Sequence, residues 1–214
     1  MVRLLAISDV VDEGLRTAAT RLRPDLVVAC GDLPFEYVEH VMTVANAPLV
    51  YVPGNHDPDL RRRRSGEWPP SPPEHRDADP PGPRGGTNVD AVVVEEVGLR
   101  VAGLGGSHRY RDGPNQYSQR EMRRRVRSLV RRSRWRRPRG RSVDVLVTHA
   151  PPAGVGDDDD LAHVGFDAFH DVYAALRPSV HLHGHVHPHE GVAAERRVGS
   201  TRVVNVIPYR VLEV

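Results

Sequence analysis

The sequence contains no lysine, so all 30 of its basic residues are arginines. The 28 acidic residues almost balance them, and the formal net charge is only +2. A molecule with so weak an overall field can attract a polyanion only through a local patch. We interpret the missing lysine as the use of arginine on ordinary surfaces, as expected of a GC-rich genome, and it does not by itself indicate a nucleic-acid partner.

Cysteine and long apolar runs are also scarce. Cys30 is the single cysteine, which excludes an intramolecular disulfide and fits a reducing compartment. It closes an apolar run, so we expect a small core residue. No apolar run approaches the ~20 residues needed to cross a bilayer, and the first nine residues become polar too early for a signal peptide. The sequence therefore predicts a cytoplasmic protein with no membrane partner.

The length of 214 residues suits one sizeable core, and we expect a single domain over 1–214. Strand and helix patterns alternate at the start of the chain, in the order strand 2–8, helix 12–23, strand 25–30, helix 34–46 and strand 48–52. Such alternation with short connections is typical of βαβ units and a mainly parallel sheet.

The pattern stops in residues 58–86, which contain four consecutive arginines, repeated prolines and almost no aliphatic residues. Such a composition buries too little apolar surface to offset the entropy lost on ordering. We predict a disordered Pro/Arg-rich insertion loop. It directly follows Gly54-Asn55-His56-Asp57, so it is expected near any site there, as a solvated insertion rather than a lid.

The rest of the chain returns to regular patterns. The expected elements are a hairpin 91–94/99–102, a helix 117–135, a strand 143–148, a helix 166–176, and strands 179–183, 191–197, 201–206 and 209–214. In the helix 117–135 the apolar positions Met122, Val126, Leu129 and Val130 form one thin stripe, and most other positions are arginine. We favour a solvated face over a phosphate-polymer surface, because aromatic residues interleaved with the arginines for base stacking are missing apart from Trp135.

Five short polar segments follow apolar runs at the expected strand ends. They are Ser8-Asp9, Gly31-Asp32, Gly54-Asn55-His56-Asp57, Thr148-His149 and Gly184-His185-Val186-His187. Singly they also suit helix caps, turns or a His-rich surface turn. Together they supply carboxylate, amide and imidazole groups that suit borderline-hard divalent metals. Ligands of open α/β sheets bind at this edge.

In this order the segments resemble the motif series of the calcineurin-like metallophosphoesterase superfamily, which runs Asp-x-His, Gly-Asp, Gly-Asn-His-(Asp/Glu), His and Gly-His-x-His. The resemblance spans about residues 2–188, and the segments 103–107 and 148–152 also look like those of small bacterial single-domain members. It implies an α/β fold, a four-layer αββα sandwich of two mixed sheets, with a dinuclear metal site at the strand ends.

The resemblance also implies roles for individual residues. Two divalent ions (Mn, Fe, Ni or Zn) would be held, the first by Asp9, Asp32 and His187, and the second by Asp32 as bridge with Asn55, His149 and His185. His56 would be the general acid, with Asp57 as its orienting partner. His163 and Asn205 are further candidates near the site, for which we favour a structural role.

One position departs from the family pattern. Val11 stands where the first motif has a histidine, and valine cannot coordinate a metal. The first ion could then be held by fewer protein ligands, Asp12 or Glu13 could substitute, or the first site could stay empty. We favour weaker binding of the first ion with activity retained.

The predicted function is metal-dependent phosphoester hydrolysis, with a metal-bridging hydroxide attacking the phosphorus in line. A small phosphodiester is favoured as substrate over a monoester. One alternative is a catalytically silent metal- or nucleotide-binding regulator created by Val11. Another is a nuclease that uses the Arg-rich helix, although nucleic acid is not the favoured partner. The sequence predicts no particular oligomeric state.

Overall fold

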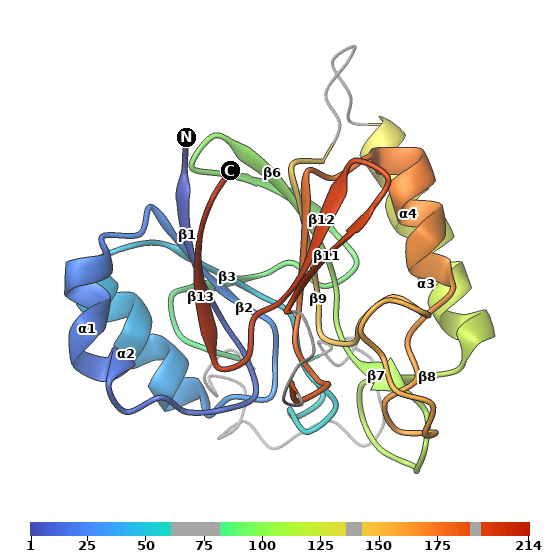
Figure 1. Cartoon of the computed structure of the whole chain (residues 1–214), viewed down its shortest axis with the longest axis horizontal. Helices are drawn as coiled ribbons and strands as arrows, with labels where there is room; N and C mark the ends of the chain where they lie inside the picture. The colour runs from blue at the N-terminus through green and yellow to red at the C-terminus, as the bar shows by residue number, and fades with distance from the viewer. Residues whose placement is uncertain (61–81, 136–142, 189–193) are drawn as a thin grey trace, which may run out of the picture.

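Two β-sheets packed face to face form the centre of the fold, and a pair of helices covers the outer face of each sheet (Figure 1). The computed structural model describes residues 1–60, 82–135, 143–188 and 194–214. Most of the predicted insertion 58–86 therefore lies outside the described residues.

The first sheet has the strand order β13-β1-β2-β3-β4. Its strands are β1 (Arg3–Ile7), β2 (Leu26–Ala29), β3 (Leu49–Tyr51), β4 (Gly86–Asn88) and β13 (Tyr209–Glu213). All neighbours pair in parallel except β13, which runs antiparallel to β1 at the edge. The helices α1 (Leu15–Leu22) and α2 (Phe35–Ala45) form the crossovers and lie on its outer face (Figure 1).

The second sheet has the order β11-β12-β10-β9-β6-β5. Its strands are β5 (Val93–Glu96), β6 (Leu99–Leu104), β9 (Val145–Thr148), β10 (Val180–His183), β11 (Glu195–Val198) and β12 (Thr201–Asn205). The four central strands are parallel, and the two edge strands are antiparallel to their neighbours. Helices α3 (Gln119–Trp135) and α4 (Ala168–Leu176) cover its outer face, and β7 (Ser107–His108) pairs with β8 (Gln116–Tyr117) in a small separate sheet.

Apolar side chains divide into three layers that match this architecture. One cluster lies between the sheets and combines residues such as Leu4 and Val28 of the first with Val147 and Leu182 of the second. The other two lie between each sheet and its helices. Strands buried on both faces need continuous apolar runs, which explains the Leu26–Ala29 pattern. The predicted αββα sandwich of two mixed sheets is confirmed.

Most of the elements expected from the sequence are present, with shorter ends. In α3, Met122, Val126 and Leu129 are buried as the stripe predicts. The helix expected over 12–23 begins only at Leu15, because the Asp12 carboxylate accepts the Leu15 N–H at 2.9 Å. Strand β4 was not expected, since Gly-Thr-Asn carries no apolar signal. Among the described residues, no helix combines the length and apolar character that a bilayer span requires.

Candidate metal centre

The carboxyl ends of the parallel strands in both sheets meet at one cavity of about 250 Å³. Asp9, Asp32 and Asn55 follow β1, β2 and β3, while His149 and His185 follow β9 and β10. The cavity is lined by Asp9, Asp32, Asn55, His56, Tyr110, Ala162, His163, His185 and His187. The structure therefore brings together segments that are far apart in the sequence, as strand ends of an α/β sheet are expected to do.

Two motif glycines allow the backbone to approach these carboxylates. A Cβ on Gly54 would overlap the Asp32 carboxylate, and a Cβ on Gly184 would overlap the Ser8 hydroxyl and the Asp9 carboxylate. Only glycine fits at either position. The end of β10 in the second sheet can thus lie directly against the end of β1 in the first.

Three of the predicted ligands have left-handed backbone conformations. The φ angles are 60° at Asp9, 57° at Asp32 and 69° at His185. A non-glycine residue in this region is uncommon and costs of order 1 kcal/mol or more. Such strain persists only where the surroundings enforce it, and here it coincides with the turns that direct side chains into the cavity.

His149 is fully buried behind the cavity, and its ring is held by hydrogen bonds on both nitrogens. Nδ1 donates to the Cys30 carbonyl at 2.8 Å. Nε2 lies 2.9 Å from Asn55 Oδ1 and 3.1 Å from Asp32 Oδ2. Two oxygen acceptors therefore converge on the nitrogen whose lone pair is available, an arrangement that requires a cation, either a proton or a metal ion, among the three atoms.

The electrostatics agree with a cation at this point. Burial alone raises the pKa of Asp32, but His149 and the backbone N–H of His56 lower it to about 2. Burial alone lowers the pKa of His149, but the Asp32 and Asp9 carboxylates and the hydrogen bond to Asp32 raise it to about 9. The carboxylates thus create a negative potential at His149 that holds positive charge.

His185 completes this half of the cavity. Its Nε2 hydrogen-bonds the Ala162 carbonyl at 2.8 Å, which leaves Nδ1 unprotonated in the neutral ring. Burial, followed by the nearby His149, lowers the pKa of His185 to about 3, so the ring is neutral. One ligand atom each from Asp32, His149 and His185 lies within 4.8 Å of the others. Carboxylate, amide and imidazole donors in this arrangement fit a divalent transition metal.

The side chains expected around the first ion are less completely arranged. Asp9 Oδ2 accepts from the Ser8 hydroxyl at 2.5 Å and from the His185 N–H at 2.9 Å. His187 lines the cavity but is exposed to solvent. Val11 packs against the apolar cluster beneath α1 and α2. This side of the cavity therefore offers Asp9, the shared Asp32 and a solvent-exposed imidazole.

Neither acidic neighbour of Val11 is placed to replace the missing histidine. The Asp12 carboxylate is bonded to the Leu15 N–H at the start of α1. The Glu13 carboxylate is paired with Arg16 at 2.7 Å. Both carboxylates thus serve local interactions around α1, whereas the cavity is lined by other residues.

His56 lies at the mouth of the cavity. Its backbone N–H donates to Asp32 Oδ1 at 2.8 Å, and Arg111 Nη2 lies 3.3 Å from its Nδ1. Because a guanidinium can only donate, this contact places the proton of a neutral imidazole on Nε2. Asp57 is not arranged as the expected orienting partner of His56: Asp57 Oδ2 accepts the N–H groups of Gly54 at 2.7 Å and Asp32 at 3.1 Å.

Two residues of the cavity region were not expected from the sequence. Asn55 Nδ2 donates to the Tyr110 hydroxyl at 3.3 Å, which turns Asn55 Oδ1 toward His149. Tyr110 and Arg111 come from the loop between β7 and β8, where no sequence pattern indicated a site. His163 does line the cavity, with its ring 5.2 Å from that of His185. Asn205 instead donates to the Val186 carbonyl at 2.7 Å and so supports the His185–His187 turn.

Comparisons with known proteins show a similar fold and identify the family. One solved crystal structure is 18% identical to this chain, with a TM-score of 0.63. The match covers 95% of this chain and 89% of the chain in that structure. Another, of a hypothetical protein from Thermus thermophilus, shares 18% identity with a TM-score of 0.45, and covers 95% of this chain and 75% of its own. No curated protein matches the sequence. The family model for calcineurin-like phosphoesterases matches residues 2–189, and the chain belongs to that family.

Proposed function

We propose that the protein is a metal-dependent phosphoesterase that acts on small phosphodiesters. The observation that supports this most strongly is the position of the His149 Nε2 atom, which lies 2.9 Å from Asn55 Oδ1 and 3.1 Å from Asp32 Oδ2. His56 lies beside that point, at the mouth of a cavity of about 250 Å³. Membership of the calcineurin-like phosphoesterase family supports the same class of reaction.

In this proposal Asp32, Asn55, His149 and His185 hold one divalent ion, and Asp9, Asp32 and His187 hold a second more weakly. Such ions, when bound, activate a water molecule for attack on phosphorus and offset charge on the phosphoryl oxygens. Tyr110 fixes the orientation of the Asn55 amide, and Asp57 braces the two turns that carry Asp32 and Asn55. These contacts keep the ligand atoms in place without substrate.

His56 supplies the proton that the leaving alkoxide needs. The form that donates is the imidazolium, which protonates the leaving oxygen and is left as neutral imidazole. In that form Nδ1–H turns away from Arg111, because a guanidinium cannot accept a hydrogen bond. A general acid of this kind contributes about 10²–10⁴-fold to the rate when the leaving group is a poor one. The exposed Arg111 also places positive charge beside the cavity mouth, where an anionic substrate enters.

The preference for a diester follows from charge. One divalent ion balances the two carboxylates Asp9 and Asp32, so a centre with a weakly held first ion carries little net positive charge. A phosphodiester brings one negative charge and a monoester brings up to two, and the diester is therefore the better electrostatic match. This preference disappears if both ions are bound tightly.

The test is hydrolysis of bis-p-nitrophenyl phosphate and p-nitrophenyl phosphate after metal removal and reloading with Mn²⁺. We expect turnover of the diester to depend on added metal and to exceed that of the monoester. His56→Ala should slow an alkyl phosphodiester more than the p-nitrophenyl ester, whose leaving group needs no acid. Equal losses on both would remove the acid role. An absence of turnover with every divalent metal would instead support the silent regulator.

A further inference from the structure

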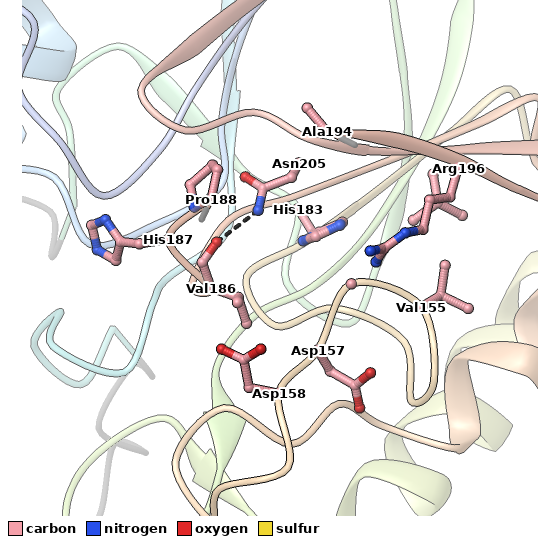
Figure 2. Close-up of a pocket in the computed structure, with 12 residues that line it drawn as sticks. Val155, Asp157, Asp158, His183, Val186, His187, Pro188, Ala194, Arg196 and Asn205 are labelled. Atoms are coloured by element: carbon pink, nitrogen blue, oxygen red, sulfur yellow. Dashed lines mark hydrogen bonds between the residues drawn. The ribbon is translucent and has the colours of Figure 1, made fainter. Parts of the chain in front are cut away.

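A second, smaller pocket adjoins the candidate metal centre. Its volume is about 110 Å³, and His187 lines both this pocket and the larger cavity. Figure 2 shows its walls, which come from the 155–158 loop, the end of β10 with the following turn, and the strands β11 and β12. A group attached to a phosphate in the cavity would therefore reach it past His187.

The pocket presents hydrogen-bond donors and acceptors together. Arg196 projects its guanidinium toward the His183 ring (Figure 2). His183 is 2% exposed, and its Nδ1 bonds the Gly184 carbonyl at 3.1 Å, which leaves Nε2 as an acceptor in the neutral ring. A Cβ at Gly156 would lie 2.9 Å from Arg196 Nη1, so the glycine leaves room for the guanidinium.

The charges in the pocket disfavour a second anion. Asp157 and Asp158 both line it, and Arg196 is the one arginine among its described lining residues. One oxygen of Asp157 accepts the Gly165 N–H at 3.0 Å, which anchors this acidic wall in place. A phosphate or carboxylate entering here would meet the Asp157 carboxylate. A neutral hydroxyl group, in contrast, can accept from the guanidinium and donate to a carboxylate or to an imidazole nitrogen.

We infer that this pocket binds the hydroxyl-bearing alcohol part of the phosphoester, such as a glycerol or sugar group. The inference rests on the proposed function, because the phosphate is taken to lie at the metal centre. The volume fits a group of only a few heavy atoms, which matches a three-carbon polyol or one edge of a sugar ring. Asn205 supports the turn after β10, which lines this pocket, through its bond to the Val186 carbonyl (Figure 2).

The test compares two esters that differ only in hydroxyl groups: p-nitrophenyl 2,3-dihydroxypropyl phosphate and p-nitrophenyl propyl phosphate. The variant is Arg196→Gln, with Arg196→Lys as the conservative form. Arg197→Gln is the matched control, because Arg197 is the exposed next residue on the same strand and does not line the pocket. Thermal unfolding checks that each variant folds.

The native protein should have a kcat/KM for the dihydroxypropyl ester about tenfold or more above that for the propyl ester, as expected for hydrogen bonds to a charged group. Arg196→Gln should raise the KM for the dihydroxypropyl ester, so that the two esters have similar kcat/KM values. Arg196→Lys should restore part of the difference, and Arg197→Gln should leave it unchanged. Equal rates on both esters in the native protein would overturn the inference, as would a ratio that survives Arg196→Gln.

A binding measurement separates this inference from the proposed function. Calorimetry with glycerol 1-phosphate and propyl phosphate on the Mn²⁺-loaded protein needs no turnover. If the protein hydrolyses neither ester but binds glycerol 1-phosphate about tenfold more tightly in an Arg196-dependent way, the reaction is wrong and the pocket stands. If it hydrolyses both esters equally and binds both phosphates equally, the pocket is wrong and the reaction stands.

Discussion

Binding of the more tightly held divalent ion to this protein should release about one proton at pH 7, and that proton should come from His149. In the metal-free protein the Asp32 and Asp9 carboxylates outweigh the effect of burial and raise the pKa of His149 to about 9. A metal ion needs the neutral imidazole and must displace the Nε2 proton. Asp32, with a pKa of about 2, is already ionised, and His185, with a pKa of about 3, is already neutral.

The cost of removing this proton follows from the difference between the pKa of His149 and the pH of the experiment. At pH 7, about two units below the His149 pKa, removing the proton costs about 2.7 kcal/mol, or roughly 100-fold in the dissociation constant. Between about pH 6.5 and 8, affinity should rise about tenfold per pH unit, because one proton is displaced per ion. Above the His149 pKa the dependence should disappear. The positive charge that stabilises the empty site is thus lost as the pH rises.

The assay is calorimetric titration of the metal-free protein with Mn²⁺ in two buffers of different ionisation enthalpy, from which the number of released protons follows. His149→Gln should bind Mn²⁺ weakly and release almost no proton. His40→Gln, which alters a histidine on α2 outside the cavity, should behave as the native protein does. Proton release that persists in His149→Gln, or a native affinity independent of pH, would refute the reasoning.

Three further predictions follow from individual contacts. Tyr173→Phe removes the hydroxyl 2.5 Å from Nδ1 of the fully buried His181 and should lower the free energy of unfolding in urea by about 1–3 kcal/mol. Asp57→Ala loses the acceptor for the Gly54 and Asp32 N–H groups, so the Mn²⁺ dissociation constant should rise about tenfold or more. It should not change in Asp112→Ala on the exposed loop. Val11→His should lower the free energy of unfolding by about 1–3 kcal/mol, because Val11 packs against the apolar cluster beneath α1 and α2. Metal analysis of this variant should show no additional tightly bound ion, and a second tight ion would contradict this placement of residue 11.

The strand ends could be predicted from the sequence because buried parallel strands require continuous apolar runs. The segment Leu26–Ala29 is buried throughout, and the polar residues after it can only lie at the sheet edge. The position of Asp57 could not be predicted in the same way. Its contacts run to backbone N–H groups of two turns, and backbone groups leave no trace in sequence patterns. The apolar stripe of α3 was predictable because its period follows helix geometry alone.

The two residues of the cavity region that the sequence did not predict come from the loop between β7 and β8. Tyr110 and Arg111 reach Asn55 and His56 from the β7–β8 loop, which belongs to no βαβ unit. A strand edge positions residues through a repeating ladder, whereas this loop is placed by contacts particular to it. Two backbone N–H groups of the loop, at Tyr110 and Arg111, share the Gln116 side-chain oxygen at 3.3 Å. Only tertiary structure can reveal such a placement.

The two halves of the centre are therefore held in different ways, and this difference bears on how the family pattern tolerates Val11. His149, His185 and Asn55 are each fixed by a contact outside the metal site, to the Cys30 carbonyl, the Ala162 carbonyl and the Tyr110 hydroxyl. A pre-oriented set of ligands loses little entropy when an ion binds. On the other side, His187 is exposed and Val11 packs against an apolar cluster, so we expect an ion there to find fewer ligands already held in place. We therefore expect Val11 to weaken binding of the first ion and to leave the ligands of the second site in place.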